Sequence, residues 1–374
     1  MKKTTLALLG LLVAVFVFSS CNRNDTEDPT PTPDPIESLV DQQNATEKEP
    51  INLSVLEGGI TVPGTKKDGA PPAPTGKVDI QVNSTEVTAL QEHGLYASFS
   101  STDFGKVAGA YIVFKEEGGE TSNSYFDIPA SEFRPEGWRV GNSKSEKKGN
   151  KLTLGNNQRT NEIEDAYIPI DLSNVPAGRF CYDICIYDTD NNISQIIEVC
   201  VEIEAWGGNS EIIGSWDLKD AIYTYGGMSV SFKDIECENG DILNLEESEV
   251  FEHFNVNMIF NEDGTWVFNI DMKEHPIDYD ASYEDCSLVP GTEEGYHEKY
   301  TEKGKWSYDE ENNQLFLVLF ESIDELEPEY SYVDEDGELL IRGDFSINGD
   351  RLTITEEFSY DGGIERYELI FDRQ

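Results

Sequence analysis

Hydrophobic and polar residues alternate along most of the second half of the chain, which is the pattern of strands that bury one face. Over residues 254–260 the even positions are Phe, Val, Met and Phe, while asparagines stand at 255 and 257. The same alternation recurs over residues 266–272 and 341–347. It predicts strands whose apolar side chains turn toward one interior while the opposite wall meets water.

The pattern predicts eight strands, at residues 214–225, 253–260, 265–272, 299–308, 314–320, 338–347, 351–358 and 365–372. The connections after the second, fourth and sixth strands are tight turns. Those after the first, third and fifth are long and cover residues 226–252, 273–298 and 321–337. Alternate connections of an up-and-down meander lie at the same end, and eight strands can close into a small barrel. We therefore expect a cup-shaped barrel. Tight turns close one end, the floor, and long connections surround the other end, the mouth.

The first half of the chain has shorter β-rich runs and no helical period. Examples are residues 78–82, 109–114, 125–128 and 167–170, which are separated by turn-forming residues. This pattern is typical of a β-sandwich, which we expect to be immunoglobulin-like. The predicted fold class is thus all-β, with the sandwich at residues 51–206 and the barrel at residues 211–374.

The last hairpin of the predicted sandwich can be read in register. Centring its turn between Asp190 and Asn191 places Cys181 opposite Cys200 on neighbouring strands. A disulfide there is geometrically reasonable in an oxidising compartment, and a pair of buried reduced thiols is the alternative. Cys185 is left without a partner in this pairing.

The chain is strongly acidic, with a formal net charge of -47 from 74 acidic and 27 basic residues. Such a field repels nucleic acid and anionic lipid head groups, so we expect no nucleic-acid partner and no direct adsorption to a membrane. Hydrophobic residues make up 38% of the chain, which is enough for folded cores. The acidity therefore belongs to solvated surfaces.

Signatures of catalysis and of metal binding are missing from the sequence. The four histidines, His93, His253, His275 and His297, have no partner at a metal-ligand spacing such as i, i+4. The acidic turn at residues 188–192 lacks the glycine and the late glutamate that a calcium loop needs. We expect no metal, no cofactor and no enzymatic activity.

The N-terminus carries the pattern of an export signal. Lys2 and Lys3 precede an apolar run at residues 6–18, which is too short to span a bilayer and ends in Ser19-Ser20-Cys21. This resembles the lipobox of bacterial lipoproteins, with Phe18 where Leu is usual. The resemblance implies that residues 1–20 are a signal peptide and that Cys21 carries a lipid that holds the protein at the membrane. An ordinary signal peptide with an incidental cysteine is the alternative.

Residues 21–50 are acidic and proline-rich, and predict an extended tether. Asp25, Glu27 and Asp28 are similar to the acidic export signals of Bacteroidota-type surface lipoproteins, and a merely soluble linker is the alternative. Asn22 after the cysteine resembles a lipoprotein released to the outer membrane. The implied location is the cell envelope, lipid-anchored at the outer membrane, with exposure at the cell surface left open.

Gly214-Ser215-Trp216 is similar to the Gly-x-Trp opening of lipocalins. In order along the chain, Cys237, residues 260–266 with their Asp-Gly-Thr turn, Cys286 and Gly304-Lys305-Trp306 resemble the lipocalin-like domain of bacterial lipoproteins. The resemblance covers residues 212–374. It implies an eight-stranded, lipocalin-like up-and-down β-barrel.

Two side-chain contacts are expected in this barrel. Cys237 and Cys286 fall in the first and third connections, which lie at the same mouth, so we expect a disulfide that staples the rim. The resemblance implies that Gly214 and Trp216 lie at the floor, and that Arg373 covers the Trp216 ring through a cation–π contact. An arginine simply exposed near the C-terminus is the alternative.

The sequence leaves two functions open. Inward Trp266, Phe268, Met272 and Trp306 either line a cavity for a small hydrophobic or glycan ligand or fill the barrel solidly. The first case is a lipid-anchored binding module, and the second a non-catalytic surface protein that contacts protein or polysaccharide partners. Aromatic residues on the third connection, Tyr279, Tyr283 and Tyr296, favour the second.

Overall fold

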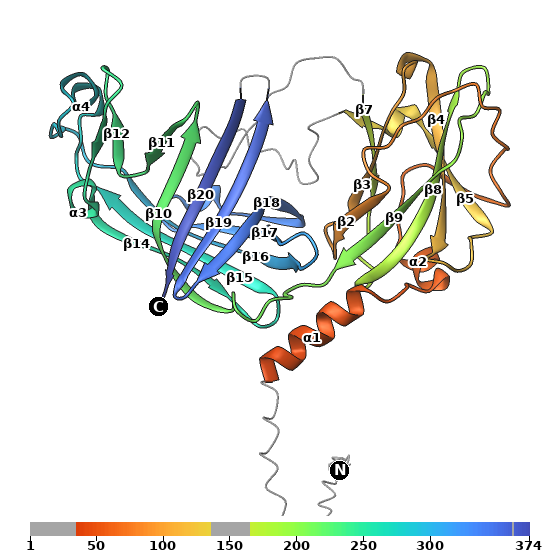
Figure 1. Cartoon of the computed structure of the whole chain (residues 1–374), viewed down its shortest axis with the longest axis horizontal. Helices are drawn as coiled ribbons and strands as arrows, with labels where there is room; N and C mark the ends of the chain where they lie inside the picture. The colour runs from red at the N-terminus through yellow and green to blue at the C-terminus, as the bar shows by residue number, and fades with distance from the viewer. Residues whose placement is uncertain (1–34, 136–164, 361–362) are drawn as a thin grey trace, which may run out of the picture. The chain divides into compact units, whose positions relative to one another are not determined.

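A computed structural model describes residues 35–135, 165–360 and 363–374. The predicted signal peptide, residues 1–20, and the predicted lipid attachment site, Cys21, lie outside the described residues. Two β-rich parts follow one another along the described chain, the first ending at residue 204 and the second beginning at residue 214 (Figure 1). Within the described residues, the helices are all too short or too polar to cross a membrane.

The second half of the predicted tether is helical. Helix α1 (Pro35–Glu47) follows residue 34, and helix α2 (Leu53–Gly59) comes next. Helix α1 is held against the folded chain, because Gln43 Nε2 donates a hydrogen bond of 2.9 Å to the Trp206 carbonyl. The prediction of an extended spacer is therefore wrong for residues 35–47, where side chains find partners in the folded part.

The N-terminal part consists of two sheets. One has six strands in the order β1-β5-β4-β8-β9-β2, and the other has three in the order β3-β7-β6. The strands are β1 (Thr65–Asp68), β2 (Glu86–Leu90), β3 (Leu95–Ser100), β4 (Val107–Glu116), β5 (Ser124–Pro129), β6 (Arg134–Pro135), β7 (Asp165–Ile170), β8 (Gly178–Asp188) and β9 (Ile197–Glu204). Two 3-10 turns, η1 (Phe104–Lys106) and η2 (Ala130–Glu132), lie between them. Apolar residues of both sheets share one core.

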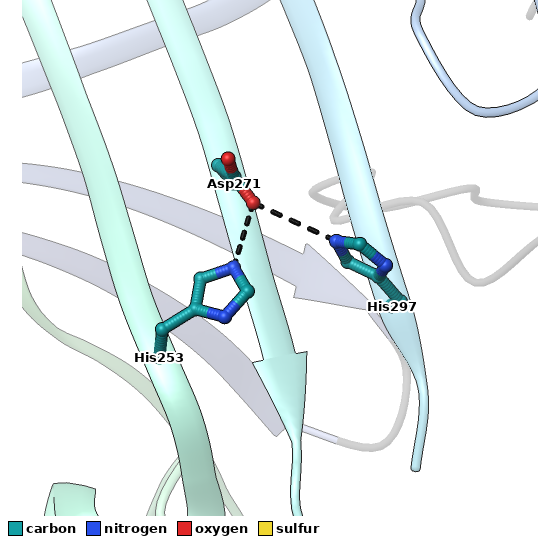
Figure 2. Close-up of side chains that lie close together, drawn as sticks. All are labelled: His253, Asp271 and His297. Carbon is teal, nitrogen blue, oxygen red and sulfur yellow. Dashed lines mark hydrogen bonds and ion pairs between the residues drawn. The ribbon is translucent and has the colours of Figure 1, made fainter. Parts of the chain in front are cut away.

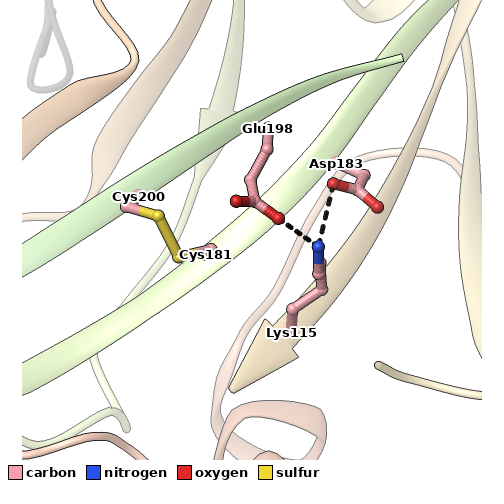
Figure 3. Close-up of a disulfide and its surroundings, with 5 residues drawn as sticks. All are labelled: Lys115, Cys181, Asp183, Glu198 and Cys200. Atoms are coloured by element: carbon pink, nitrogen blue, oxygen red, sulfur yellow. Dashed lines mark hydrogen bonds and ion pairs between the residues drawn. A yellow bond between two sulfur atoms is a disulfide. The ribbon is translucent and has the colours of Figure 1, made fainter. Parts of the chain in front are cut away.

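The register of the β8–β9 hairpin follows the sequence prediction. Cys181 pairs with Cys200 across the ladder, and the two form a disulfide (Figure 3). Beside it, Lys115 of β4 forms ion pairs with Asp183, at 3.4 Å, and with Glu198. The predicted pairing is confirmed, and these charges share the sheet face that carries the disulfide.

The strand predicted at residues 78–82 is wrong. Ile80 is 3% exposed and belongs to the core, but the backbone there pairs through an isolated bridge between Gln81 and Ser100. The apolar alternation therefore reflects side chains that an irregular segment packs onto the core. The alternation of apolar and polar residues in this segment thus comes from side-chain burial and not from a strand that is hydrogen-bonded in a sheet.

The C-terminal part is built around one antiparallel sheet that closes on itself. Its eight barrel strands run β10-β14-β15-β16-β17-β18-β19-β20, and β10 also pairs with β20 (Figure 1). Their bounds are β10 (Gly214–Tyr225), β14 (Phe251–Phe260), β15 (Thr265–Glu274), β16 (His297–Asp309), β17 (Gln314–Asp324), β18 (Tyr332–Asn348), β19 (Arg351–Tyr360) and β20 (Gly363–Arg373). The predicted eight-stranded barrel is confirmed, and so are the inward faces, because Trp266 and Phe345 lie in one core with Phe254 packed against it.

Two of the three predicted long connections are present. The first connection carries β11 (Met228–Ser231), β12 (Asp234–Glu236), β13 (Ile242–Asn244) and helix α3 (Glu247–Val250), and the third connection, after β15, carries helix α4 (Tyr279–Asp285). The long connection predicted after the fifth strand, at residues 321–337, is wrong. Strand β17 continues to Asp324 and β18 begins at Tyr332, with the short turn η3 (Pro328–Tyr330) between them. Bulges in this pair interrupt the alternation, and the sequence pattern therefore hides the strand ends.

Strand β10 changes partner along its length. Residues 214–217 pair with β14, whereas residues 222–225 pair with β11. The wall between β10 and β14 is therefore hydrogen-bonded at the floor and parted toward the mouth. Phe232 lies at this parting, with its ring stacked on Phe254 at 5.2 Å between centroids.

Two buried carboxyl groups predict a pH-dependent stability. Glu47 of α1 and Glu204 of β9 are 4% and 2% exposed and hydrogen-bond to each other. Burial raises the pKa of both groups, and the charge of Glu47 raises the pKa of Glu204 further. A raised folded pKa contributes stability below the unfolded value of 4.5, and that contribution is lost as the pH rises through the folded pKa.

We expect Glu204→Gln to be more stable than the parent at pH 8, by about 1–3 kcal/mol, because the parent must keep the buried Glu204 carboxyl protonated far above its unfolded pKa, whereas Gln is neutral at every pH. The advantage should shrink toward pH 5. Thermal unfolding between pH 5 and pH 8 measures it, with the exposed Glu86→Gln on β2 as control. A variant that loses stability equally at both pH values would contradict the raised pKa of Glu204.

Candidate functional site

The floor of the barrel is filled by three tryptophans. Trp216, Trp266 and Trp306 are 0%, 1% and 0% exposed. Their indole N–H groups donate to the backbone carbonyls of Ile212 at 2.7 Å, Lys305 at 2.9 Å and Asn261 at 3.3 Å, respectively. Two of the four predicted ligand-lining residues, Trp266 and Trp306, therefore belong to a packed floor whose polar atoms are already satisfied.

Arg373 covers the outer side of this floor. Its guanidinium carbon lies 4.1 Å from the centroid of the Trp216 ring, and Arg373 pairs with Trp216 across β20 and β10. The guanidinium also donates to the carbonyls of Ile213 at 3.1 Å and Glu211 at 2.6 Å. A Cβ at Gly214, where φ is +135°, would stand 3.1 Å from Arg373 Nη1. The contact implied by the sequence resemblance is thus present, although the arginine keeps an exposed face.

The mouth half of the inner wall mixes apolar side chains with carboxyl groups. In the β15–β16 ladder Phe268 pairs with Glu302 and Met272 pairs with Glu298, so the four share one face. Phe268 and Met272 are half-buried, whereas Glu302 is 6% exposed. Burial raises the pKa of Glu298 and of Tyr300, which lies between the two carboxyl groups on β16. These groups are desolvated, and a hydroxyl or ammonium group of a ligand would stabilise their charged form.

The wall formed by β10, β19 and β20 has the same character. Tyr223 and Tyr367 are cross-strand partners with ring centroids 4.7 Å apart, and Glu356 pairs with Tyr367 from the other side. Burial and the neighbouring Tyr367 and Glu365 raise the pKa of Tyr223 to about 12. On the described barrel strands, lysine and arginine occupy outward register positions, apart from Arg373 at the floor.

The rim carries exposed hydrophobic side chains. In the described barrel, those that are large and exposed lie at the mouth: Tyr225, Met228, Tyr279, Tyr283, Tyr296, Leu326, Tyr330, Val333 and Ile364. A polar cavity of about 540 Å³ lies between residues 274–280 and 291–296. The predicted disulfide between Cys237 and Cys286 is present and joins the first and third connections. The aromatic rim is therefore held by a covalent link.

The first part of the chain has a second hollow, which sequence reasoning missed. It measures about 280 Å³ and is lined by the proline-rich residues 70–74 together with side chains of β4 and β8, among them Cys185. Cys185 is unpaired and buried, and burial raises the pKa of its thiol to about 11. At neutral pH this thiol is protonated and inert.

A cluster on the outer wall of the barrel was also missed. His253 of β14, Asp271 of β15 and His297 of β16 converge there (Figure 2). The His253 Nε2 lies 2.7 Å from Asp271 Oδ1, and the His297 Nε2 lies 3.6 Å from the same oxygen. The hydrogen bond from His253 lowers the pKa of Asp271. Helical spacing rules cannot find this group, because a sheet ladder and not the sequence interval brings it together.

Comparison with known protein families finds no match to the chain, and comparison with curated proteins finds none either. The functional argument therefore rests on the barrel interior, the rim and the charges described above.

The rim disulfide predicts a loss of stability on removal. Cys237 and Cys286 are 49 positions apart, so the link restricts a long loop of the unfolded chain. We expect the double substitution Cys237→Ser, Cys286→Ser to lower the free energy of unfolding by about 2–4 kcal/mol. Urea unfolding measures this, with Cys181→Ser, Cys200→Ser, which opens a separation of 19, as the matched comparison. Unchanged unfolding of the first variant would contradict a stabilising staple.

Proposed function

We propose that the protein is a lipid-anchored lipoprotein of the cell envelope, whose lipocalin-like barrel binds a small amphipathic ligand at its mouth. The observation that carries the proposal is the division of the barrel interior. Trp216, Trp266 and Trp306 pack the floor, while Phe268 and Met272 stay half-buried above it beside desolvated carboxyl groups. The packed floor closes the lower end of the barrel, and the apolar side chains and carboxyl groups above it line a shallow, concave site of the kind that binds small ligands.

Several features support the family assignments within this proposal. The Gly214-Ser215-Trp216 opening, the closed eight-stranded meander and the Arg373 contact on Trp216 favour a lipocalin-like barrel. Two sheets around one core favour an immunoglobulin-like first domain. The lipobox resemblance at Cys21 supports the anchor, and two disulfides favour an oxidising compartment such as the outer envelope.

The charge of the inner wall restricts the ligand. Glu298, Glu302 and Glu356 occupy inward positions of the mouth half, and the barrel's lysines face outward. A fatty-acid carboxylate entering this wall would meet like charges in a poorly solvated space. Sugar hydroxyls or an ammonium group would instead donate hydrogen bonds to the carboxylates while a ring or chain packs on the aromatic side chains. A glycan fragment or another neutral or cationic amphiphile is therefore the ligand class that we propose.

The exposed rim favours a second candidate. In the described barrel, nine large exposed hydrophobic side chains gather at the mouth, which is typical of surfaces that contact a macromolecule. In this alternative the protein is a non-catalytic surface protein whose rim binds a protein or polysaccharide, and the small-ligand cup is incidental.

Three amphiphiles with one alkyl chain and different head groups distinguish these proposals. We expect dodecyl maltoside and dodecyltrimethylammonium to bind the purified protein, and dodecyl sulfate to bind at least about 10-fold more weakly, because its charge opposes the inner wall. Calorimetry below the micelle concentration measures the affinities. Replacing Glu298 and Glu302 by Gln should reduce the difference, whereas Glu321→Gln on the outer face should not.

Equal affinity for the three head groups would contradict the proposed wall chemistry. Absence of binding by any of them, together with capture of a polysaccharide that depends on Tyr279 and Tyr283, would favour the rim alternative.

The anchor can be tested by counting thiols. The chain has six cysteines, of which four lie in disulfides, leaving Cys185 and Cys21. A lipid thioether blocks Cys21, so protein extracted from its own membranes should show one alkylatable thiol in denaturant without reductant. Mass spectrometry after iodoacetamide treatment gives the count. Two reactive thiols and an intact N-terminus would contradict lipidation.

A further inference from the structure

We propose that His253, Asp271 and His297 bind a divalent transition-metal ion such as zinc on the outer wall of the barrel (Figure 2). One nitrogen of each imidazole and one carboxylate oxygen lie within 4.8 Å of one another. The site lies on the opposite face of β14–β16 from the inner wall that carries Phe268 and Met272. It is therefore independent of the ligand proposed for the cup.

The sheet ladder fixes the positions of the three side chains. His253 and His297 are both cross-strand partners of Lys273, one from β14 and the other from β16. Asp271 lies two residues before Lys273 on the central strand, so each histidine reaches it along a diagonal. The rings stand edge to face, with centroids 5.7 Å apart. Backbone hydrogen bonds of three neighbouring strands hold this geometry, and the site is preorganised.

The donor set selects the metal. Two imidazoles and one carboxylate suit zinc, copper or nickel, whereas calcium and magnesium prefer all-oxygen sites. Ligands of a tetrahedral zinc lie about 2.0–2.2 Å from the ion, so neighbouring donors stand about 3.3 Å apart. Side-chain rotations are enough to bring donors within 4.8 Å to that spacing. The side chains are 34–45% exposed, which leaves the remaining coordination position to water.

The charged groups around the site orient the carboxylate. Lys299 Nζ lies 3.6 Å from Asp271 Oδ2, while both histidines face Oδ1. Lys299 also pairs with Glu325 at 3.1 Å, and Lys273 pairs with Glu252 at 2.7 Å. Both ammonium groups thus have carboxylate partners, and Asp271 keeps one oxygen directed at the imidazoles. Such outer contacts fix the orientation of metal ligands.

The test uses the full chain, purified without a histidine tag and treated with a chelator. We expect one high-affinity equivalent of Zn²⁺ by calorimetry, and a visible absorption band when Co²⁺ replaces zinc. His253→Asn, His297→Asn and Asp271→Asn should each weaken zinc binding by at least about 10–100-fold, the range seen when even an outer contact of a metal site is lost.

Two matched controls keep the test specific. His275→Asn and His93→Asn remove histidines that are not part of the cluster, and should retain the parent's zinc affinity. Thermal unfolding of the metal-free variants should match the parent, because the three substituted side chains are partly exposed. Retention of tight zinc binding by His253→Asn and His297→Asn, or absence of a high-affinity equivalent in the parent, would overturn the proposal.

Discussion

The closure of the barrel between its first and last strands is the constraint on which the rest of the C-terminal part depends. Strand β10 pairs with β20 over nearly its whole length, and with β14 only over residues 214–217. Trp216 lies at the one place where β10 has both partners, and Arg373 lies over its ring. Without the pairing of β10 with β20 the sheet would keep two open edges, and its apolar face would have no enclosed interior to line.

The packed floor explains how one barrel can have both a solid core and a lined mouth. Gly304 leaves room for the Trp266 ring, because a Cβ there would stand 2.7 Å from the indole and 1.9 Å from the Val318 carbonyl oxygen. The three indoles therefore fill the lower interior of an eight-stranded barrel, which has space for little else. Above them the first connection parts the wall between β10 and β14, and the inner side chains become half-exposed. The same eight strands thus enclose a packed core at the floor and a partly open interior at the mouth.

Alternation and turn lengths were enough to predict the barrel. The tight turn at residues 261–264 even sets the register of β14 against β15, so Phe254 falls opposite Met272. The register of β16 against β15 could not be predicted from turn length, because a connection of more than twenty residues separates the two strands. The histidine cluster needs both registers at once, and for that reason spacing rules failed to find it. Bulges between β17 and β18 likewise interrupt the alternation of apolar and polar residues. The pairing that resumes at Glu321 was therefore not predicted from the sequence.

Because successive side chains of a strand point to opposite faces, β14–β16 present two different chemistries on one set of backbones. Phe268, Met272 and Glu302 face inward, while Asp271 and the two histidines face outward. A slip of one residue in either ladder would exchange the two sets, placing Asp271 in the interior and Met272 in water. The disulfide from Cys237 to Cys286 joins the connections that flank these strands. It therefore opposes such a slip at the mouth, where β14 has lost β10 as a partner and the ladder is least supported.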